Sequence, residues 1–210
     1  MESARDIVQA PVKDSVRVLV KGGAEVVVKG HAVEPPKDIT NKYNYCLYSG
    51  ISSDKISPLI EYVKDLEYGA TLNLYINSKG GVVPVAIGVY NYIRSIKGLK
   101  VNTYNMGHCD SAATLLFMLG EKRYVTKNSS FYMHSLQIRL PNPQTISALK
   151  SELLNLTEDT KNFINLLSES SDISKKQWQS WMSDKGTMIK YKKAITKGIA
   201  NIILEENTKI

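Results

Sequence analysis

The chain has 210 residues, of which 43% are hydrophobic and 22% charged, as in a globular protein with one full core. No apolar run reaches the length of a membrane span, and Met1–Ala10 lacks the apolar stretch of a signal peptide, so we expect no membrane partner. Two cysteines, Cys46 and Cys109, make neither a disulfide framework nor a metal-ligand spacing, so we expect a cytoplasmic protein.

The formal net charge of +7 raises the question of nucleic-acid binding. The lysines are scattered, however, and only the stretch 190–197 is locally dense in them. No nucleic-acid motif accompanies that stretch, and few aromatic residues are interleaved with it. We therefore interpret the charge as a solvated basic surface and expect no nucleic-acid partner.

The N-terminal part, residues 1–41, predicts a hairpin and a connector. Val16–Val20 and Glu25–Lys29 have strand patterns, and Gly22 and Gly23 between them permit a tight reversal. The following polar run contains Pro35 and Pro36, which mark a connector. This part is too small for a core of its own, so residues 42–210 form the main domain.

From Tyr45 onward, short strands and amphipathic helices alternate. Tyr45–Tyr48 is a strand, and the apolar positions of 56–66 repeat at helical spacing up to Gly69. Leu72–Ile76 is the next strand, followed by a helix that opens near Pro84 and ends at Gly98. Such alternation predicts an α/β fold with a mostly parallel sheet and right-handed crossovers.

The second half of the chain predicts three more strands and three helices. The first two strands are Arg123–Thr126 and Phe131–His134. After a proline-containing connector at 138–143, Thr145 opens the longest helix, whose apolar seam would pack on the core or on another subunit. A shorter helix capped by Ser174 carries two tryptophans, and a final helix ending at Gly198 precedes a strand at 199–204.

Ser111 is the first candidate for chemistry. The alternating pattern predicts a strand at Val101–Tyr104, followed by Gly107 and a short polar turn, and Ser111 lies where an apolar helix begins. Backbone N–H groups and the positive end of the helix dipole at such a position favour a nucleophile. The alternative is that Ser111 only caps the helix. Cys109 is a rival nucleophile, although a small buried residue is its default role.

His134 is the candidate base, because it lies 134 − 111 = 23 positions after Ser111. That interval holds a helix and a strand, enough to return the chain to the same edge of a sheet. A catalytic triad also needs an acid that orients the imidazole. Asp159, Asp172 and Asp184 lie downstream, and spacing alone does not rank them.

A glycine-rich turn, Asn77–Gly81, lies between a strand and a helix. Such turns bring backbone N–H groups close to a ligand. Its spacing matches neither the Walker A loop nor GxGxxG, the two glycine-rich motifs that bind phosphate groups. It could supply an oxyanion donor or a rail for an extended peptide, or it could be a bare turn.

Four segments together resemble the caseinolytic protease (ClpP) family of serine peptidases, over about residues 45–204. The resemblance implies a ClpP/crotonase-like fold, a spiral of ββα units with a long protruding helix. It also implies a homo-oligomer of stacked rings that takes unfolded proteins or peptides from an AAA+ ATPase. The peptidase itself would need no cofactor. The segments are Tyr45–Gly50, Leu74–Gly81, Gly107–Phe117 and Phe131–His134.

On the matching positions, the resemblance implies that Ser111 is the nucleophile and His134 the general base. The N–H groups of Gly81 and Ala112 would form the oxyanion hole, and residues 82–84 would pair with the substrate backbone. The reaction would be endopeptidase hydrolysis of a peptide bond through an acyl-enzyme.

The chain departs from the family pattern at three positions. Lys79 replaces a usual proline, and Asp110 replaces a small residue before the serine. Gly186 stands where the catalytic aspartate is expected, and the nearest acid is Asp184, two residues earlier. We therefore take Asp184 as the candidate acid.

Two other functions remain open. One is a non-catalytic ring subunit that assembles with an active paralogue. The other is a crotonase-like acyl-CoA enzyme, which Ser111 and His134 disfavour because those enzymes combine oxyanion N–H groups with carboxylates.

Overall fold

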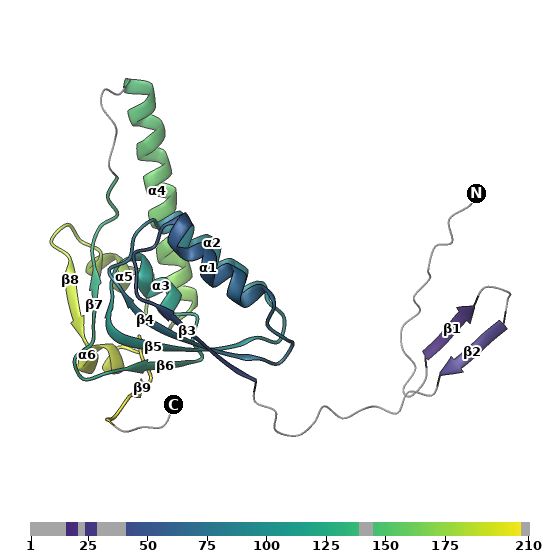
Figure 1. Ribbon diagram of the computed structural model, residues 1–210. Helices are drawn as coiled ribbons and strands as arrows, with labels where there is room; N and C mark the ends of the chain where they lie inside the picture. The colour runs from purple at the N-terminus through teal and green to yellow at the C-terminus, as the bar shows by residue number, and fades with distance from the viewer. Residues whose placement is uncertain (1–15, 21–23, 29–40, 139–144, 207–210) are drawn as a thin grey trace. The chain divides into compact units, whose positions relative to one another are not determined.

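The computed structural model describes residues 16–20, 24–28, 41–138 and 145–206 (Figure 1). It divides into two compact units, Met1–Ile39 and Thr40–Ile210. In the first unit, β1 (Val16–Val20) and β2 (Ala24–Val28) pair antiparallel, which confirms the expected hairpin. The glycine turn between them and the proline-containing connector lie outside the described residues.

The second unit is built on a mostly parallel sheet, as expected from the strand–helix alternation. Neighbours in its main path pair parallel, while β7 (Ser130–Met133) pairs with the end of β5 and antiparallel with β8 (Thr187–Lys190). The main path runs in the order β3 (Lys42–Leu47), β4 (Thr71–Ser78), β5 (Lys100–Cys109), β6 (Lys122–Val125) and β9 (Ile202–Ile203).

Three helices follow the first three of these strands: α1 (Ser53–Lys64), α2 (Val83–Ser95) and α3 (Ala112–Phe117). In Figure 1, α1 and α2 lie beside each other over the sheet. Their apolar faces are buried as the spacing predicted, and α3 is buried on all sides because it runs through the core.

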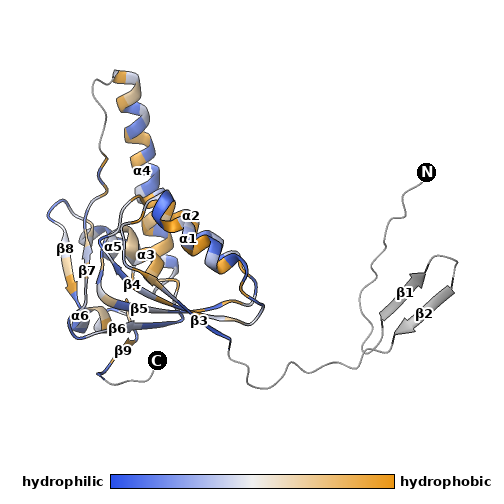
Figure 2. Ribbon diagram, in the orientation of Figure 1, coloured by the Kyte–Doolittle hydropathy of each residue, from blue (hydrophilic) through white to orange (hydrophobic). Residues whose placement is uncertain are grey.

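The long helix predicted from Thr145 is α4 (Ile146–Glu169), which projects beyond the rest of the unit (Figure 1). The Thr145 side chain accepts a hydrogen bond from the Ala148 N–H at 3.1 Å, so it caps this helix. The seam divides into two parts. Its C-terminal half is buried in the core, whereas Ile146 and Leu153 near the other end are 74% and 66% exposed. The hydropathy colouring in Figure 2 shows hydrophobic and hydrophilic bands along α4.

The short helix expected after Ser174 is α5 (Lys175–Trp181), and α6 (Tyr191–Thr196) precedes the last strand. The Ser174 side chain accepts from the Gln177 N–H, as a cap does. Trp178 and Trp181 are buried with their rings nearly perpendicular, 5.2 Å apart. The two indoles are therefore core residues.

Arg123 on β6 fastens the C-terminal segment to the sheet. Its guanidinium donates to the carbonyl oxygens of Gly120, Gly198 and Ile199 at 2.7–3.1 Å. Partial burial lowers the pKa of this guanidinium, and the nearby Asp172 carboxylate opposes that shift. Because these carbonyls depend on one side chain, Arg123 stabilises the junction of α6, β6 and β9.

The glycine-rich turn after β4 packs directly against the turn that carries Ser111. Gly80 has a φ of +84°, and a Cβ atom there would lie 2.5 Å from the carbonyl oxygen of Asp110 and 2.9 Å from the nitrogen of Ala112. A side chain would therefore need a strained backbone and would push the two turns apart. Only glycine allows this contact.

We predict that Gly80→Ala lowers the free energy of unfolding by about 2–4 kcal/mol, because it adds a clash to a left-handed backbone. Gly88→Ala is the matched control: this exposed glycine lies within α2 with nothing within 4 Å of an added Cβ. The control should gain about 0.5–1 kcal/mol. Urea unfolding followed by circular dichroism measures both, and equal stability of Gly80→Ala and wild type would contradict the packing described above.

We also predict that Arg123→Met lowers the free energy of unfolding by about 2–4 kcal/mol, since three carbonyl groups lose a charged donor. Lys122→Met, at the exposed neighbouring position on β6, should change it by less than about 0.5 kcal/mol. Thermal unfolding compares the two variants. Similar melting temperatures would show that Arg123 does not hold the C-terminal segment.

Candidate active site

Ser111 lies in the sharp turn between β5 and α3, where its backbone is strained. Its φ is 51°, and it is the only residue other than glycine with a positive φ in the described part of the chain. Ser111 occupies the N-cap position, yet its side chain makes no capping hydrogen bond. The strain and the uncommitted hydroxyl are features of a functional position, so the capping alternative receives no support.

The Ser111 turn is tied to two other strands. The Ser111 N–H donates to the Tyr132 carbonyl on β7 at 2.7 Å, and the Asp110 N–H donates to the Ser78 carbonyl on β4 at 3.0 Å. The Asp110 carboxylate also accepts the Tyr132 N–H at 2.8 Å. These bonds lock the turn between the ends of three strands.

Burial raises the pKa of the Asp110 carboxyl, while His108, the Tyr132 N–H, Lys79 and His134 lower it. His108 is the nearest of the charged partners, with its Nδ1 3.4 Å from an Asp110 carboxylate oxygen. The sequence pattern did not assign Asp110 any role. Its place immediately before the candidate nucleophile was the available signal.

His134 follows β7 and is half-buried. Its Nδ1 lies 2.7 Å from the carbonyl oxygen of Ser135. A carbonyl oxygen only accepts hydrogen bonds, so Nδ1 carries the proton of the neutral imidazole and Nε2 keeps its lone pair. This tautomer is the one that a general base requires.

Ser111 and His134 line the same pocket, which has a volume of about 660 Å³. Lys79, Gly80 and Gly81 form another part of its wall. No hydrogen bond joins Ser111 and His134 within the described residues. Catalytic hydrogen bonds are often long in unliganded enzymes and tighten when substrate binds, so this separation is compatible with a nucleophile and its base.

Gly81 lines this pocket, and Ala112, the first residue of α3, adjoins Ser111. Gly81 forms a parallel bridge with Ile51, in which the Ile51 N–H donates to the Gly80 carbonyl and the Val82 N–H donates to the Ile51 carbonyl. Because these bonds use the groups of the residues on either side, the N–H of Gly81 itself stays available. The Ala112 N–H lies in the first turn of a helix, where no intrahelical acceptor exists.

The acid is the part of the expected site that the structure does not bring together. Asp184 is exposed, does not line the pocket, and makes no hydrogen bond to His134 in the described chain. Its loop is nevertheless attached beside the histidine, because the Ser135 N–H donates to the Ser183 carbonyl at 3.3 Å. Of the other aspartates considered, Asp159 lines the pocket and Asp172 does not.

Gly186 stands next to His134 at the end of a strand pair. The β7–β8 ladder pairs Met133 with Thr187, so the next position along it places Gly186 opposite His134. A Cβ atom on Gly186 would lie 2.2 Å from the Tyr132 hydroxyl oxygen. Tyr132 therefore fills the space that a side chain at 186 would use.

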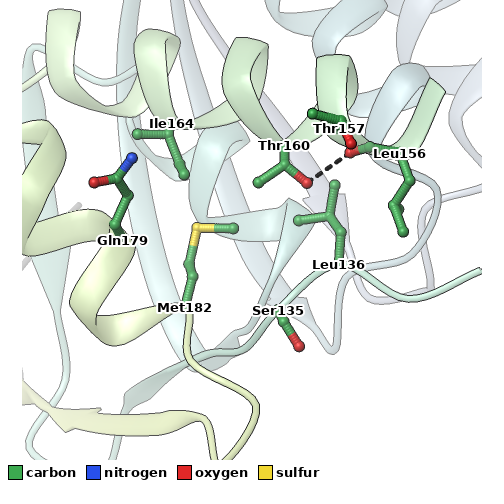
Figure 3. A pocket seen from close by; sticks show the side chains of 8 residues that line it. All are labelled: Ser135, Leu136, Leu156, Thr157, Thr160, Ile164, Gln179 and Met182. Atoms are coloured by element: carbon green, nitrogen blue, oxygen red, sulfur yellow. Dashed lines mark hydrogen bonds between the residues drawn. The ribbon is translucent and has the colours of Figure 1, made fainter. Parts of the chain in front are cut away.

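A second cavity of about 330 Å³ adjoins the first between α4 and α5 (Figure 3). Leu136 and Leu156 line both cavities. In Figure 3, the side chains of Ile164, Met182 and Leu136 point toward one another, and the Thr160 hydroxyl is bonded to the Leu156 carbonyl. This second space is mainly apolar.

Cys109, the rival nucleophile, is fully buried at the end of β5. Burial raises the pKa of its thiol well above the usual value, so it stays a neutral thiol away from solvent. Among the described residues, no group of three His, Cys, Asp or Glu side chains has the arrangement of a metal site. The described helices also include none that is long and apolar enough to cross a membrane.

Known proteins resemble the chain in sequence and in fold. Three ATP-dependent Clp protease proteolytic subunits, from three strains of Dehalococcoides mccartyi, are each 37% identical to the chain over 65 residues. That segment is 30% of this chain and 32% of each relative, so the match spans about a third of these proteins.

A ClpP1 mutant from Listeria monocytogenes has a similar structure, with a TM-score of 0.65 at 20% identity. The similarity covers 78% of this chain and 92% of that one, and it confirms the ClpP/crotonase-like fold. The model of the Clp protease family matches residues 38–207. The chain therefore belongs to the Clp protease family.

Proposed function

We propose that the chain is a serine endopeptidase that hydrolyses peptide bonds in unfolded proteins or peptides through an acyl-enzyme. The observation that carries this proposal is the pairing of Ser111 and His134 in one pocket. Ser111 is strained and has an uncommitted hydroxyl, and His134 is held in the tautomer of a base. Family membership favours this function over that of an acyl-CoA enzyme.

In the proposed reaction, the Ser111 hydroxyl attacks the peptide carbonyl while His134 Nε2 accepts its proton. The N–H groups of Gly81 and Ala112 stabilise the negative oxygen of the tetrahedral intermediate. His134 then gives the proton to the leaving amine, and the acyl group stays on Ser111. A water molecule, deprotonated by the same histidine, releases the acyl group and restores the hydroxyl.

Asp184 is proposed as the acid that stabilises the protonated histidine. The bond between Ser135 and Ser183 supports this role, because it attaches the Asp184 loop to the residue after His134. A rearrangement of that exposed loop would be needed to bring the carboxylate to the imidazole.

The assembly is proposed to be a homo-oligomeric ring in the cytoplasm that can receive substrates from an AAA+ ATPase. The exposed apolar residues of α4 support an oligomer, because a contiguous apolar helix face in water favours burial against another chain. Cys46 and Cys109 are both free thiols, as a reducing compartment would leave them.

A non-catalytic ring subunit is the second candidate function. The observation in its favour is Gly186, which places no carboxylate opposite His134.

We predict that a fluorophosphonate labels the wild-type protein covalently and leaves Ser111→Ala unlabelled, because the reagent requires an activated serine. His134→Ala should be labelled about 10²–10⁴-fold more slowly, as expected when a general base is lost. Intact-protein mass spectrometry measures the adduct. Ser95→Ala, which removes an exposed hydroxyl on α2, is the matched control and should be labelled like wild type. A folded wild type that takes no label would favour the non-catalytic subunit.

If Asp184 stabilises the protonated His134, Asp184→Asn should lower kcat for a fluorogenic peptide by up to about 10⁴-fold, since an amide cannot replace the carboxylate. Steady-state kinetics with purified protein measures this change. Asp65→Asn, at the exposed end of α1, provides the control and should keep the wild-type rate. An unchanged rate in Asp184→Asn would remove Asp184 from the mechanism.

A further inference from the structure

One wall of the pocket is a face of α4 that carries two acidic residues. Glu152, Leu156 and Asp159 are separated by four and three positions, so they lie on the same face of the helix. All three line the pocket that contains Ser111, and all three are half-buried. The two carboxylates stand about 10 Å apart along the helix axis, one on each side of the leucine.

These carboxylates are not neutralised by the protein around them. Neither forms an ion pair with any residue that the structure describes, whereas Glu158 on the outer face of α4 pairs with Lys161 at 3.6 Å. Among the described residues, Lys79 is the one lysine in the pocket wall, and it is exposed and lowers the pKa of the Asp110 carboxyl. The α4 wall therefore presents unpaired negative charge to whatever enters.

The two carboxylates line a cavity and do not form an acidic patch on the open surface. Ser111 is only 8% exposed, lines this pocket, and has no hydrogen bond from its hydroxyl in the described structure. Every buried side-chain nitrogen and oxygen of the described residues has a hydrogen-bond partner, so the unbonded Ser111 oxygen is open to the pocket and free to contact a ligand there. The carboxylates of Glu152 and Asp159 therefore line the same cavity as the Ser111 hydroxyl, which can contact a polar group of a bound ligand.

The remaining lining indicates the shape of the side chain that would bind. Leu156 lies between the two acids, and Leu136 and Ile138 contribute further apolar surface to the pocket. Lysine and arginine have long aliphatic stems that pack on such surface and a cationic end that pairs with a carboxylate. An acidic side chain would meet repulsion, and an apolar one would leave the carboxylates desolvated without a partner.

We propose that Glu152 and Asp159 select peptide substrates that carry lysine or arginine beside the scissile bond. This inference rests on the proposed peptidase function for its location, while the binding preference itself does not require hydrolysis. The two acids are specificity residues, which contact the substrate side chain and take no part in bond cleavage.

The test uses internally quenched peptides that differ at one position. Each carries either lysine or norleucine, which has the same stem without the ammonium group, at successive positions around the cleaved bond. The full-length wild type should cleave the best lysine peptide with about tenfold higher kcat/KM than its norleucine partner, a factor typical of two partly exposed ion pairs.

The variant Glu152→Gln/Asp159→Asn should bring this ratio of lysine to norleucine close to one. Glu158→Gln removes an acid of the same helix that does not line the pocket, so it should keep the tenfold ratio. A ratio near one in wild type would overturn the proposal. If Asp159→Asn lowered kcat/KM for the lysine and the norleucine peptide by the same factor, Asp159 would act on His134. Its role in selecting the substrate would then be overturned.

Binding to Ser111→Ala separates this proposal from the peptidase proposal. The dissociation constants of fluorescently labelled lysine and norleucine peptides are compared by anisotropy, and the lysine peptide should bind about tenfold more tightly. If wild type cleaves no peptide while this difference persists, the peptidase function fails and the selection by Glu152 and Asp159 stands. Equal binding of the two peptides would overturn the selection.

Discussion

The arrangement of the pocket depends on a strained backbone conformation at Ser111, which contacts with neighbouring residues must stabilise. A φ of 51° costs a residue with a side chain on the order of 1–3 kcal/mol, and neighbours must stabilise it. The N–H groups of Asp110 and Ser111 donate to carbonyl oxygens of β4 and β7 and supply that stabilisation, and Gly80 lets the neighbouring turn approach without a Cβ atom. The sheet order is thereby linked to the chemistry, because strands β4, β5 and β7 must end together for Ser111 to face the pocket.

Much of this arrangement follows from local sequence. Apolar spacing located the helices and strands, and the turn at Ser111 and the glycine pair were recognisable because each lies between a strand and a helix. The sequence also contains a repeat of asparagines: Asn44, Asn73 and Asn102 recur every 29 residues and form a hydrogen-bonded ladder across β3, β4 and β5. The stacked rings of Tyr75 and Tyr104 repeat the same spacing two residues later. In a parallel sheet, such a repeat also fixes the strand register.

The side-chain partners could not be read in the same way, because they depend on register and rotamers across the sheet. The spacing indicated a strand from Val101 to Tyr104, whereas β5 continues to Cys109, where it pairs with β4 beyond a bulge and with β7. That extension brings Asp110 to the Tyr132 N–H, a contact between residues 22 positions apart. The bond from His134 to the Ser135 carbonyl involves a main-chain oxygen, which residue types do not reveal.

The acid of a triad has two tasks, which are to orient the imidazole and to stabilise its positive charge. In this chain the Ser135 carbonyl already orients His134, but a neutral dipole stabilises an imidazolium less well than a carboxylate. The Asp110 carboxylate is close enough for its ionised form and the protonated His134 to attract each other. This attraction acts without direct contact, and His108 competes for the same carboxylate. If Asp184 is the acid, as proposed, its task is therefore the charge rather than the orientation. The Ser135 carbonyl explains how a histidine opposite Gly186 can keep the tautomer of a base.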